Sequence, residues 1–546
     1  MLTLSFCQAP ARESADFASE RIPLHTFRNP VLPGCHPDPS ICRVGADFYL
    51  VTSSFAYYPG LPLFHSRDLV RWRQLTHVLN RPGQLPLRGL DVSDGIWAPT
   101  IRHHDGTFYV VSTLAVNRRG RLTFVVTAED PEGPWSDPVP LDADGIDPSL
   151  FFDDDGRCWL TACRDAVAGA GPGELWMREL DLDRLKLVGP THVLWHGAVR
   201  GAWVEAPHLY KHDGLYHLIA AEGGTESNHS VTAARANVVT GPYVTDPRSP
   251  LLTHRHHSLD APIQNVGHAD LVETPDGETW AVTLGVRPID GVHTLGREVF
   301  LVPVSWSARG PVFAPESGGV RLLERLPSMA PVEGNGDATT GRVRFDKPEL
   351  GLEWNSLRGP VSDRIKPSAD GGGLDIDLSP EPLSSTGVPA FIARRQQHVR
   401  FRARASISFR AAHAAEEAGL AVFQNQDHHA TLGLTADENG AAQIVLTVRE
   451  AGISSRLASA AQAGLAHGAQ PHAPHADETL LEVEADENGY TFRASGDTLG
   501  TLERSFFSTE HAGGFVGVYL GLYGTSNGHA GQGRARVHWF DYEPAG

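Results

Sequence analysis

Residues 36–51, HPDPSICRVGADFYLV, contain a short strand-forming segment near Asp38, a turn at Gly45 and a second apolar segment that includes Tyr49. Apolar, β-prone runs on either side of a glycine turn are typical of a β-hairpin. The same plan returns four more times, with a leading residue and a later aromatic at Ala98 and Tyr109, Asp147 and Trp159, Ala206 and Tyr216, and His268 and Trp280. The N-terminal part of the chain therefore repeats one supersecondary unit.

An all-β, turn-rich repeat of this length predicts a β-propeller, in which each repeat forms one blade around a central axis. Five repeats predict five blades over residues 25–328, after a flexible tail at residues 1–24. A β-sandwich with coincidental turn spacing is the alternative. It does not explain why two strands, a turn and a leading residue match five times, so we favour the propeller.

The repeat pattern stops after about residue 325, and residues 329–341 are rich in Gly, Asp and Thr, as expected of a linker. Alternating apolar residues then predict a second all-β domain over residues 342–546, a β-sandwich of jelly-roll, lectin-like type. Its expected strands include residues 342–345, 401–409, 441–449, 480–485 and 513–523, with a loop at 464–475. This half gathers no acidic or nucleophilic residues at matching positions, so we expect it to pack against the propeller and cap it.

The chain has 46 Lys and Arg against 65 Asp and Glu, a formal net charge of −19, which disfavours nucleic acid or an anionic membrane as partner. The five cysteines are odd in number and include none beyond Cys163, which indicates a reducing compartment and not a disulfide framework. The N-terminus lacks the features of a signal peptide, and no apolar run reaches about 18 residues. We expect a cytoplasmic protein. A homo-oligomer is left open.

Superposing the repeats brings chemically useful side chains together at the axis. Asp38, Asp147 and His268 are leading residues, while Trp97 and Glu205 directly precede theirs. Three crowded carboxylates raise the pKa of at least one of them, as a general acid near neutral pH requires. Two carboxyl groups of different pKa on either side of a bond are what glycoside cleavage needs. Either Asp alone would be a turn residue of an Asp-Pro corner, but their matching positions favour catalysis.

Three other motifs are weaker. Residues 153–156, DDDG, resemble a calcium loop but lack the Glu that an EF-hand needs, so we expect a hairpin turn. His254, His256 and His257 have no Cys or paired carboxylate nearby, which favours a solvated loop over a zinc site. Residues 222–225, EGGT, lack the Lys of a phosphate-binding loop. We expect them to let the backbone approach a sugar.

Six short segments occur in a set order along the chain. They are residues 29–40 (NPVLPGCHPDPS), 95–100 (GIWAPT), 145–151 (GIDPSLF), 205–210 (EAPHLY), 221–225 (AEGGT) and 296–298 (GRE). Together they resemble glycoside hydrolase family 43, and within it the β-xylosidases and α-L-arabinofuranosidases with an appended C-terminal β-sandwich. The resemblance implies inverting hydrolysis in a propeller pocket. It makes Asp38 the general base, Glu205 the general acid, and Asp147 the residue that raises the pKa of the acid and holds it in place.

The resemblance also implies a set of binding residues. Arg297 matches an arginine that contacts sugar hydroxyls, and Trp97 and Phe55 match walls of the sugar subsite, where an apolar face stacks on the ring. His268 matches a histidine beneath the pocket that in several relatives contacts a structural calcium ion, usually with waters completing the ligand shell. No cofactor is expected for the chemistry itself.

The resemblance favours an exo-acting enzyme that releases β-D-xylose from the non-reducing end of small xylo-oligosaccharides. An α-L-arabinofuranosidase acting on arabino-oligosaccharides, or a bifunctional enzyme, is the alternative. An endo-arabinanase or fructan-cleaving relative would need an open groove, whereas the appended domain favours a closed pocket. A carbohydrate-binding propeller without turnover is the remaining hypothesis from another class.

Overall fold

The computed structural model describes residues 26–166, 172–199, 203–328, 341–462, 478–531 and 533–545. These residues are nearly all in strands and turns, with a short helix α1 (Thr509–Ala512) and the 3-10 turn η3 (Arg504–Phe507), so the all-β class is confirmed. The tail predicted at 1–24, the loop predicted at 464–475 and the linker predicted at 329–341, apart from Gly341, lie outside the described residues. No helix within the described ranges is long and apolar enough to cross a bilayer.

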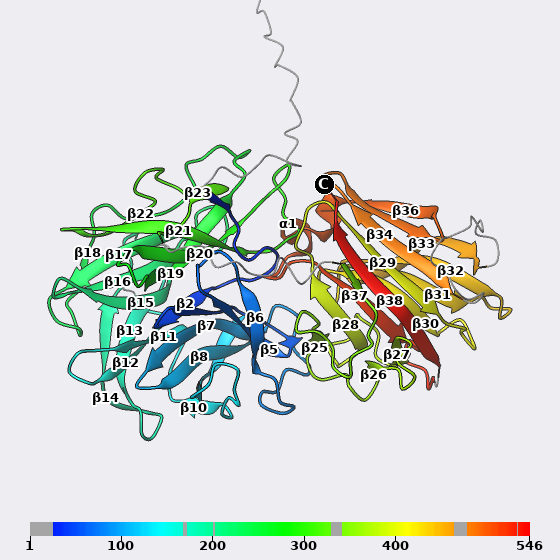
Figure 1. The fold of residues 1–546 in the computed structure, drawn as a ribbon, viewed down its shortest axis with the longest axis horizontal. Helices are drawn as coiled ribbons and strands as arrows, with labels where there is room; N and C mark the ends of the chain where they lie inside the picture. Colours follow the sequence, from blue (N-terminus) through cyan, green and yellow to red (C-terminus); the bar gives the residue numbers. More distant parts are fainter. Residues whose placement is uncertain are drawn as a thin grey trace, which may run out of the picture.

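Each of the five repeats forms one four-stranded antiparallel sheet (Figure 1). Within each sheet the strands follow chain order, so the first strand of every repeat lies at an edge. The sheets are β2 (Ser40–Val44), β3 (Asp47–Val51), β5 (Gly60–Ser66) and β6 (Arg73–Leu79); β7 (Gly95–His104), β8 (Thr107–Val116), β9 (Arg119–Ala128) and β10 (Val139–Leu141); β11 (Ile146–Phe152), β12 (Cys158–Arg164), β13 (Glu174–Asp181) and β14 (Lys186–Trp195); β15 (Val204–His212), β16 (Leu215–Glu222), β17 (Ser230–Ala236) and β18 (Val244–Thr245); β19 (Gln264–Glu273), β20 (Thr279–Val286), β21 (Glu298–Ser307) and β22 (Gly310–Phe313).

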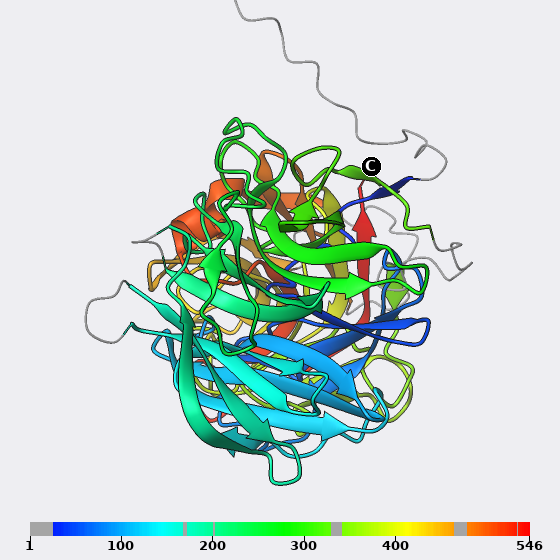
Figure 2. The same cartoon turned by 90° about the vertical axis from the view of Figure 1, so that its left-hand side faces the viewer.

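The first strands of the five sheets meet around a common axis. Ser40 on β2 donates a hydrogen bond to Asp270 on β19 (2.6 Å), and Ser149 on β11 is hydrogen-bonded to His208 on β15 (2.8 Å). The first and last sheets are therefore neighbours, as ring closure requires. β1 (Thr26–Arg28) pairs with β23 (Leu323–Arg325) beside this junction. In Figure 2, turned by 90°, these sheets lie in front of the second domain.

The blades are apolar on both faces because each is covered by its neighbours. β8 shows this most clearly, since every residue from Phe108 to Ala115 is buried. The hairpins are tight, and in the first one Val44 pairs with Asp47 across a turn in which Gly45 has a φ of 63°. Positive φ of this kind is the conformation for which glycine is suited. The glycine turns of the repeats therefore form as predicted.

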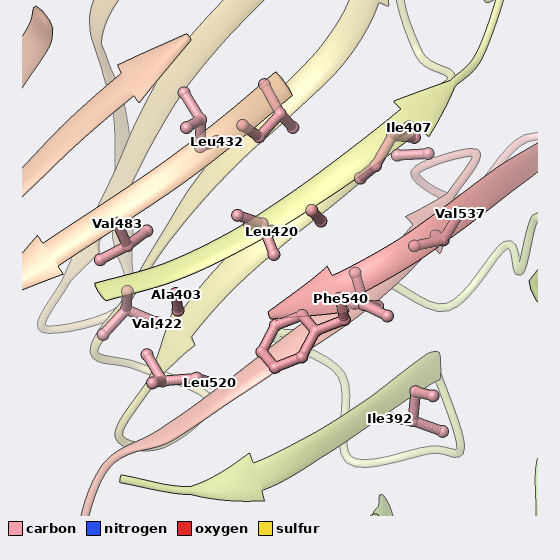
Figure 3. Close-up of a cluster of buried hydrophobic side chains, with 14 of the residues drawn as sticks. Ile392, Ala403, Ile407, Leu420, Val422, Leu432, Val483, Leu520, Val537 and Phe540 are labelled. Carbon is pink, nitrogen blue, oxygen red and sulfur yellow. The ribbon is translucent and has the colours of Figure 1, made fainter. Parts of the chain in front are cut away.

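The second domain is a two-sheet sandwich. One sheet has the order β26-β27-β38-β29-β34-β35-β36, with β24 pairing β38, and the other has β28-β37-β30-β31-β32-β33. Figure 3 shows the apolar side chains between them, with Ala403, Phe540 and Val537 from the first sheet and Leu420 and Leu520 from the second. The strands are β24 (Gly341–Val343), β26 (Ile365–Pro367), β27 (Leu374–Asp377), β28 (Ala390–Arg395), β29 (Phe401–Ser408), β30 (Glu417–Phe423), β31 (His429–Ala436), β32 (Ala442–Glu450), β33 (Ile453–Ala461), β34 (Thr479–Ala485), β35 (Gly489–Ala494), β36 (Asp497–Glu503), β37 (Tyr519–Thr525) and β38 (Arg534–Pro544).

The strand predicted at residues 513–523 is wrong in its first half. β37 begins only at Tyr519, because Gly513 and Gly514 have φ values of 71° and 85°, which an extended strand does not accommodate. The residues between α1 and β37 instead form a loop. This loop reaches the propeller, as described below.

The two domains are joined by extensive specific contacts. β25 (Ser356–Leu357) of the second domain pairs with β4 (Tyr57–Tyr58) of the propeller, and the rings of Tyr57 and Tyr519 stack with centroids 3.9 Å apart. Arg395 donates a hydrogen bond from Nε to the backbone carbonyl of Cys35 (2.7 Å). The sandwich is therefore packed against the face of the propeller that carries the Asp38 segment.

Candidate active site

The five leading residues of the repeats share an unusual backbone conformation. Asp38, Ala98, Asp147, Ala206 and His268 all have positive φ values, between 38° and 56°. This region disfavours residues with a Cβ atom by about 1–2 kcal/mol, so its recurrence at one position of every repeat shows that the fold imposes it. In four of the sheets the pairing of the first two strands also shifts register here. Such β-bulges redirect side chains, and here they bring the predicted ring together.

Asp38 is a buried carboxylate with strong partners. Its Oδ1 accepts a hydrogen bond from Nη1 of Arg297 (2.9 Å) and lies 3.4 Å from Nδ1 of His268, while Oδ2 accepts one from Oγ of Ser53 (2.6 Å). Burial by itself raises the pKa of Asp38, but Arg297, His268 and Ser53 outweigh it and hold the pKa below its ordinary value. Asp38 is therefore ionised at neutral pH.

Glu205 is half-buried at the start of β15, and its pKa is shifted in the opposite direction to that of Asp38. Burial, followed by the negative charge of Asp38, raises its pKa to about 7, against a smaller opposing effect of Arg297. A carboxyl group with this pKa keeps a large fraction of its proton near neutral pH. Glu205 can therefore donate a proton under conditions in which Asp38 can accept one.

Asp147 connects the third and fourth blades. Its Oδ2 accepts a hydrogen bond from the backbone N–H of Ala206 (3.1 Å), the residue that follows Glu205. Burial raises the pKa of Asp147 well above its ordinary value, and the negative charges of Glu205 and Asp38 raise it further. Asp147 and Glu205 therefore cannot both ionise freely, and the proton that the site holds at neutral pH lies on this pair.

Aromatic side chains surround the carboxyl groups. The rings of Phe55 and Trp97 lie 6.5 Å apart at 70°, and Nε1 of Trp97 donates a hydrogen bond to the carbonyl of Ser93 (2.9 Å). The guanidinium of Arg297 lies over the Phe55 ring at 5.9 Å. The structure thus brings together all seven residues predicted for the site, which are Asp38, Phe55, Trp97, Asp147, Glu205, His268 and Arg297.

Phe515 is a wall of this site that the sequence did not reveal. It comes from the loop before β37, and its ring lies 5.6 Å from Trp97 at 81° and 5.8 Å from the guanidinium of Arg297. Its backbone N–H donates to Oγ of Ser93 (3.0 Å), and Arg118 lies over the ring at 5.7 Å. In the sequence near Phe515, the only indication of this arrangement is the pair of glycines before it, which is typical of a loop. The second domain therefore does cap the propeller, with one aromatic side chain in the site.

A cavity of about 370 Å³ lies beside this cap, between the two domains. Ser93, Asp94 and Arg118 line it from the propeller, and Gln426 and Gly514 line it from the sandwich. Because Ser93 and Gly514 flank Phe515, the cavity lies directly outside the aromatic wall.

The weaker motifs have structural roles. Asp153 forms the expected hairpin turn, in which its N–H donates to the backbone carbonyl of Arg157 (2.9 Å). Its carboxylate accepts hydrogen bonds from Tyr216 and Lys211. The solvated loop expected for the histidine cluster is wrong for His254, which is buried. Its Nδ1 donates to the carbonyl of Ile263 (2.8 Å) and its Nε2 accepts from the N–H of Val320 (2.9 Å), so both ring nitrogens are used within the protein.

The residues beneath His268 do not fit the calcium ion that the resemblance implied. Calcium takes six to eight oxygen ligands, with carboxylates prominent among them. The nearest carboxylate along this strand, Asp270, has both oxygens occupied: Tyr210 donates to Oδ1 (2.5 Å), Ser40 to Oδ2 (2.6 Å), and Arg102 to each. Within the described ranges, no three or more His, Cys, Asp or Glu side chains form a group suited to a metal ion.

Comparison with known proteins agrees with this geometry. The family model described as "Glycosyl hydrolases family 43" matches residues 27–312, and "Beta xylosidase C-terminal Concanavalin A-like domain" matches residues 342–543. A xylosidase/arabinosidase of Butyrivibrio fibrisolvens is 39% identical, with 94% of this chain and 99% of that protein covered. The non-reducing end alpha-L-arabinofuranosidase BoGH43B of Bacteroides ovatus is 37% identical, with 95% and 94% covered.

A solved structure extends the match to three dimensions. The xylan beta-1,4-xylosidase from Bacillus halodurans superposes with a TM-score of 0.85 at 32% sequence identity, covering 95% of this chain and 100% of that one. Similarity at this level runs through both domains. With its ring of carboxyl groups at the propeller axis, the chain is a glycosidase and belongs to glycosyl hydrolase family 43.

Proposed function

We propose that the protein is an exo-acting, inverting β-xylosidase that removes single β-D-xylose units from the non-reducing end of short xylo-oligosaccharides. One observation carries the proposal: within one ring of side chains at the propeller axis, the pKa of Asp38 is lowered while that of Glu205 is raised to about 7. Inverting glycosidases need such a pair, one carboxylate to activate water and one carboxylic acid to protonate the leaving oxygen.

In the proposed reaction, ionised Asp38 takes a proton from a water molecule while the water oxygen attacks the anomeric carbon. Glu205 gives its proton to the glycosidic oxygen as the bond to the anomeric carbon breaks. Because water attacks opposite to the leaving group, the configuration inverts. Asp38 ends protonated and Glu205 ionised, and proton exchange with water restores both. Asp147 holds the strand of Glu205 through Ala206, and the negative charges of the two carboxyl groups oppose each other.

The remaining residues bind the sugar. Arg297 contacts Asp38, Phe55 and Phe515 in the site and presents a rigid fork of donors suited to hydroxyl groups. It also orients Asp38 through the 2.9 Å hydrogen bond. Phe55 and Trp97 offer apolar faces on which a pyranose ring stacks. His268 is kept neutral because burial lowers its pKa, and it supports Asp38 from below.

The contact of the second domain with the site supports exo action. Phe515 from the second domain lies beside Trp97 and Arg297 and forms part of the wall of the site. An open groove across the propeller face would need this position to be free of the second domain. A wall at this position favours binding of a chain end over binding in the middle of a chain. Short oligosaccharides are the natural substrates if the predicted cytoplasmic location holds. That location and the homo-oligomer left open above stay predictions.

An α-L-arabinofuranosidase, or an enzyme with both activities, is the second candidate. The relatives support it directly, because one is a xylosidase/arabinosidase and another is a non-reducing end alpha-L-arabinofuranosidase. The same carboxyl groups serve both reactions. Discrimination between the two sugars rests on small differences in pocket shape, typically worth about 1–3 kcal/mol.

The test compares kcat/KM on 4-nitrophenyl β-D-xylopyranoside and 4-nitrophenyl α-L-arabinofuranoside, with NMR of the anomer formed first. A preference for the xyloside with an α-xylose first product supports the proposal. Preference for the arabinofuranoside replaces it by the second candidate, and a β-xylose first product contradicts the inverting mechanism.

A further inference from the structure

A second ring of polar side chains lies beneath the catalytic ring. Two positions after the leading residues stand Ser40, Thr100, Ser149, His208 and Asp270, one from each repeat. Hydrogen bonds between Ser40 and Asp270 and between Ser149 and His208 show that four of these side chains contact one another near the axis.

Arg102 on β7 reaches into this second ring. Its Nη1 donates to Oδ2 of Asp270 (2.8 Å), Oγ of Ser40 (3.2 Å) and the carbonyls of Ile101 (2.8 Å) and Ile41 (3.3 Å). Its Nη2 donates to Oδ1 of Asp270 (3.0 Å) and contacts Nδ1 of His208 (3.1 Å). The guanidinium is thus held by groups from β2, β7, β15 and β19, which are four of the five first strands.

The two charges of this cluster are matched and almost fully enclosed. The Asp270 side chain has no exposed surface and the Arg102 side chain is 16% exposed. Despite burial, Arg102 and His208 hold the pKa of Asp270 below its ordinary value, and Asp270 raises the pKa of Arg102. A buried carboxylate requires a cation or several donors, and Arg102 meets this requirement from within the chain.

We propose that Arg102 is the built-in cation of the propeller axis and takes the electrostatic place of a bound metal ion beneath the catalytic ring. The oxygens that accept from it, those of Asp270, Ser40, Ile41 and Ile101, are carboxylate, hydroxyl and carbonyl oxygens, the ligand types that calcium prefers. In the wild-type protein the guanidinium occupies their centre. The inference extends beyond the proposed function, because it concerns the cation beneath the site and does not depend on which sugar is cleaved.

The first test uses the unaltered protein. The purified enzyme is treated exhaustively with a chelator and analysed for bound metal, for Tm and for kcat/KM, with and without added CaCl₂. We expect no bound calcium, a Tm that changes by less than about 1 °C and unchanged kcat/KM. A stoichiometric calcium ion, or activity that is lost on chelation and restored by calcium, overturns the proposal.

The second test removes the cation. Arg102→Ala leaves Asp270 buried without its cation, while the oxygens of Ser40, Ile41 and Ile101 that accepted from the guanidinium remain in place. We expect this variant to lose several °C in Tm and to regain most of it with added CaCl₂, with calcium binding detected by calorimetry. The matched control is Arg102→Ala with Asp270→Asn, which removes both charges and which we expect to show no response to calcium.

These outcomes separate a cation role from a general packing role. The proposal is overturned if Arg102→Ala lowers the Tm but added calcium does not restore it, and if the double variant shows the same Tm loss and the same lack of response. Arg102 would then act only by filling space. If the single variant does not fold without added metal, expression in the presence of calcium provides the same comparison. The chelation experiment on the wild-type protein tests the proposal whether or not the single variant folds.

Discussion

The backbone N–H of Ala206 donates a hydrogen bond of 3.1 Å to Oδ2 of Asp147, so a carboxyl group on β11 holds the residue directly after Glu205 on β15. This contact ties the geometry of one blade to that of the next. It also places Asp147 where its charge and that of Glu205 oppose each other. The role of Asp147 is therefore separable into a hydrogen bond, which an amide retains, and a charge, which an amide removes.

Asp147→Asn should keep the hydrogen bond from Ala206 and lose the charge. Without the carboxyl group beside it, Glu205 should release its proton more easily, so the basic limb of the kcat/KM profile should move to lower pH. We expect kcat to fall by about 10²-fold. The measurement is the pH profile of kcat/KM on 4-nitrophenyl β-D-xylopyranoside. An unchanged profile would exclude the role given to Asp147.

Arg297→Met should affect the opposite limb. Arg297 lowers the pKa of Asp38, so its loss should raise that pKa and move the acidic limb of the profile to higher pH. The loss of sugar contacts should also lower kcat/KM by about 10²-fold or more. Arg309→Met, at an exposed turn, is the matched control and should leave the profile unchanged. An acidic limb that stays in place would show that Arg297 does not act on Asp38.

Phe515→Ala tests whether the second domain completes the pocket. The variant loses the contacts of the ring with Trp97 and Arg297, and we expect KM to rise by about tenfold, with a smaller change in kcat. Phe506→Ala is the control, because Phe506 packs on the core of the same domain. Equal kinetic constants in the Phe515 variant and the wild type would mean that the cap takes no part in binding.

Glu205→Gln should change stability in a direction that depends on pH. The folded pKa of Glu205, about 7, lies above its ordinary value of 4.5, so its protonation favours the folded state at low pH, and this stability is lost as pH rises through 7. Gln cannot ionise. The variant should therefore match the wild type at pH 4 and exceed it at pH 8 by up to about 2 kcal/mol, a modest figure because the side chain is half-buried.

Asp38→Asn should change the stability of the fold in the opposite direction. The folded pKa of Asp38 is lowered, so its charge stabilises the fold above the ordinary pKa and that stability is lost as pH falls. The variant should be less stable than the wild type at pH 7. Chemical denaturation of both variants and the wild type at pH 4, 7 and 8 measures both changes. Stabilisation by Asp38→Asn together with destabilisation by Glu205→Gln at pH 8 would reverse the assigned protonation states.

The positions of the carboxyl groups could be predicted from the sequence because the fold repeats. Asp38 and Asp147 occupy the same position in two repeats, and Glu205 stands one residue earlier in a third. What brings Glu205 into the same ring is the register shift between Glu205 and His208, together with the positive φ of Ala206. A β-bulge of this kind depends on pairing with the next strand, and the local residues alone do not specify it.

Contacts between segments that are far apart in the chain could not be predicted from the sequence. Phe515 lies more than 400 residues from Ser93, to which its N–H donates, and in its own segment the two preceding glycines mark a loop but do not indicate a contact with the propeller. The Arg102 cluster was missed for a related reason. Arg102 stands four positions after the leading residue Ala98, where the other repeats have different residue types. Its long side chain reaches back to the ring two residues earlier, which a comparison of equivalent positions does not reveal.

The role of Glu205 as general acid is the central claim, and leaving-group dependence tests it most directly. Xylobiose has a poor leaving group that needs a proton, whereas 2,4-dinitrophenyl β-D-xylopyranoside has one that departs without it. We predict that Glu205→Gln lowers kcat/KM on xylobiose by about 10²–10⁴-fold but lowers it on the dinitrophenyl substrate by less than about tenfold. Equal losses on both substrates, or no loss on xylobiose, would contradict the assignment.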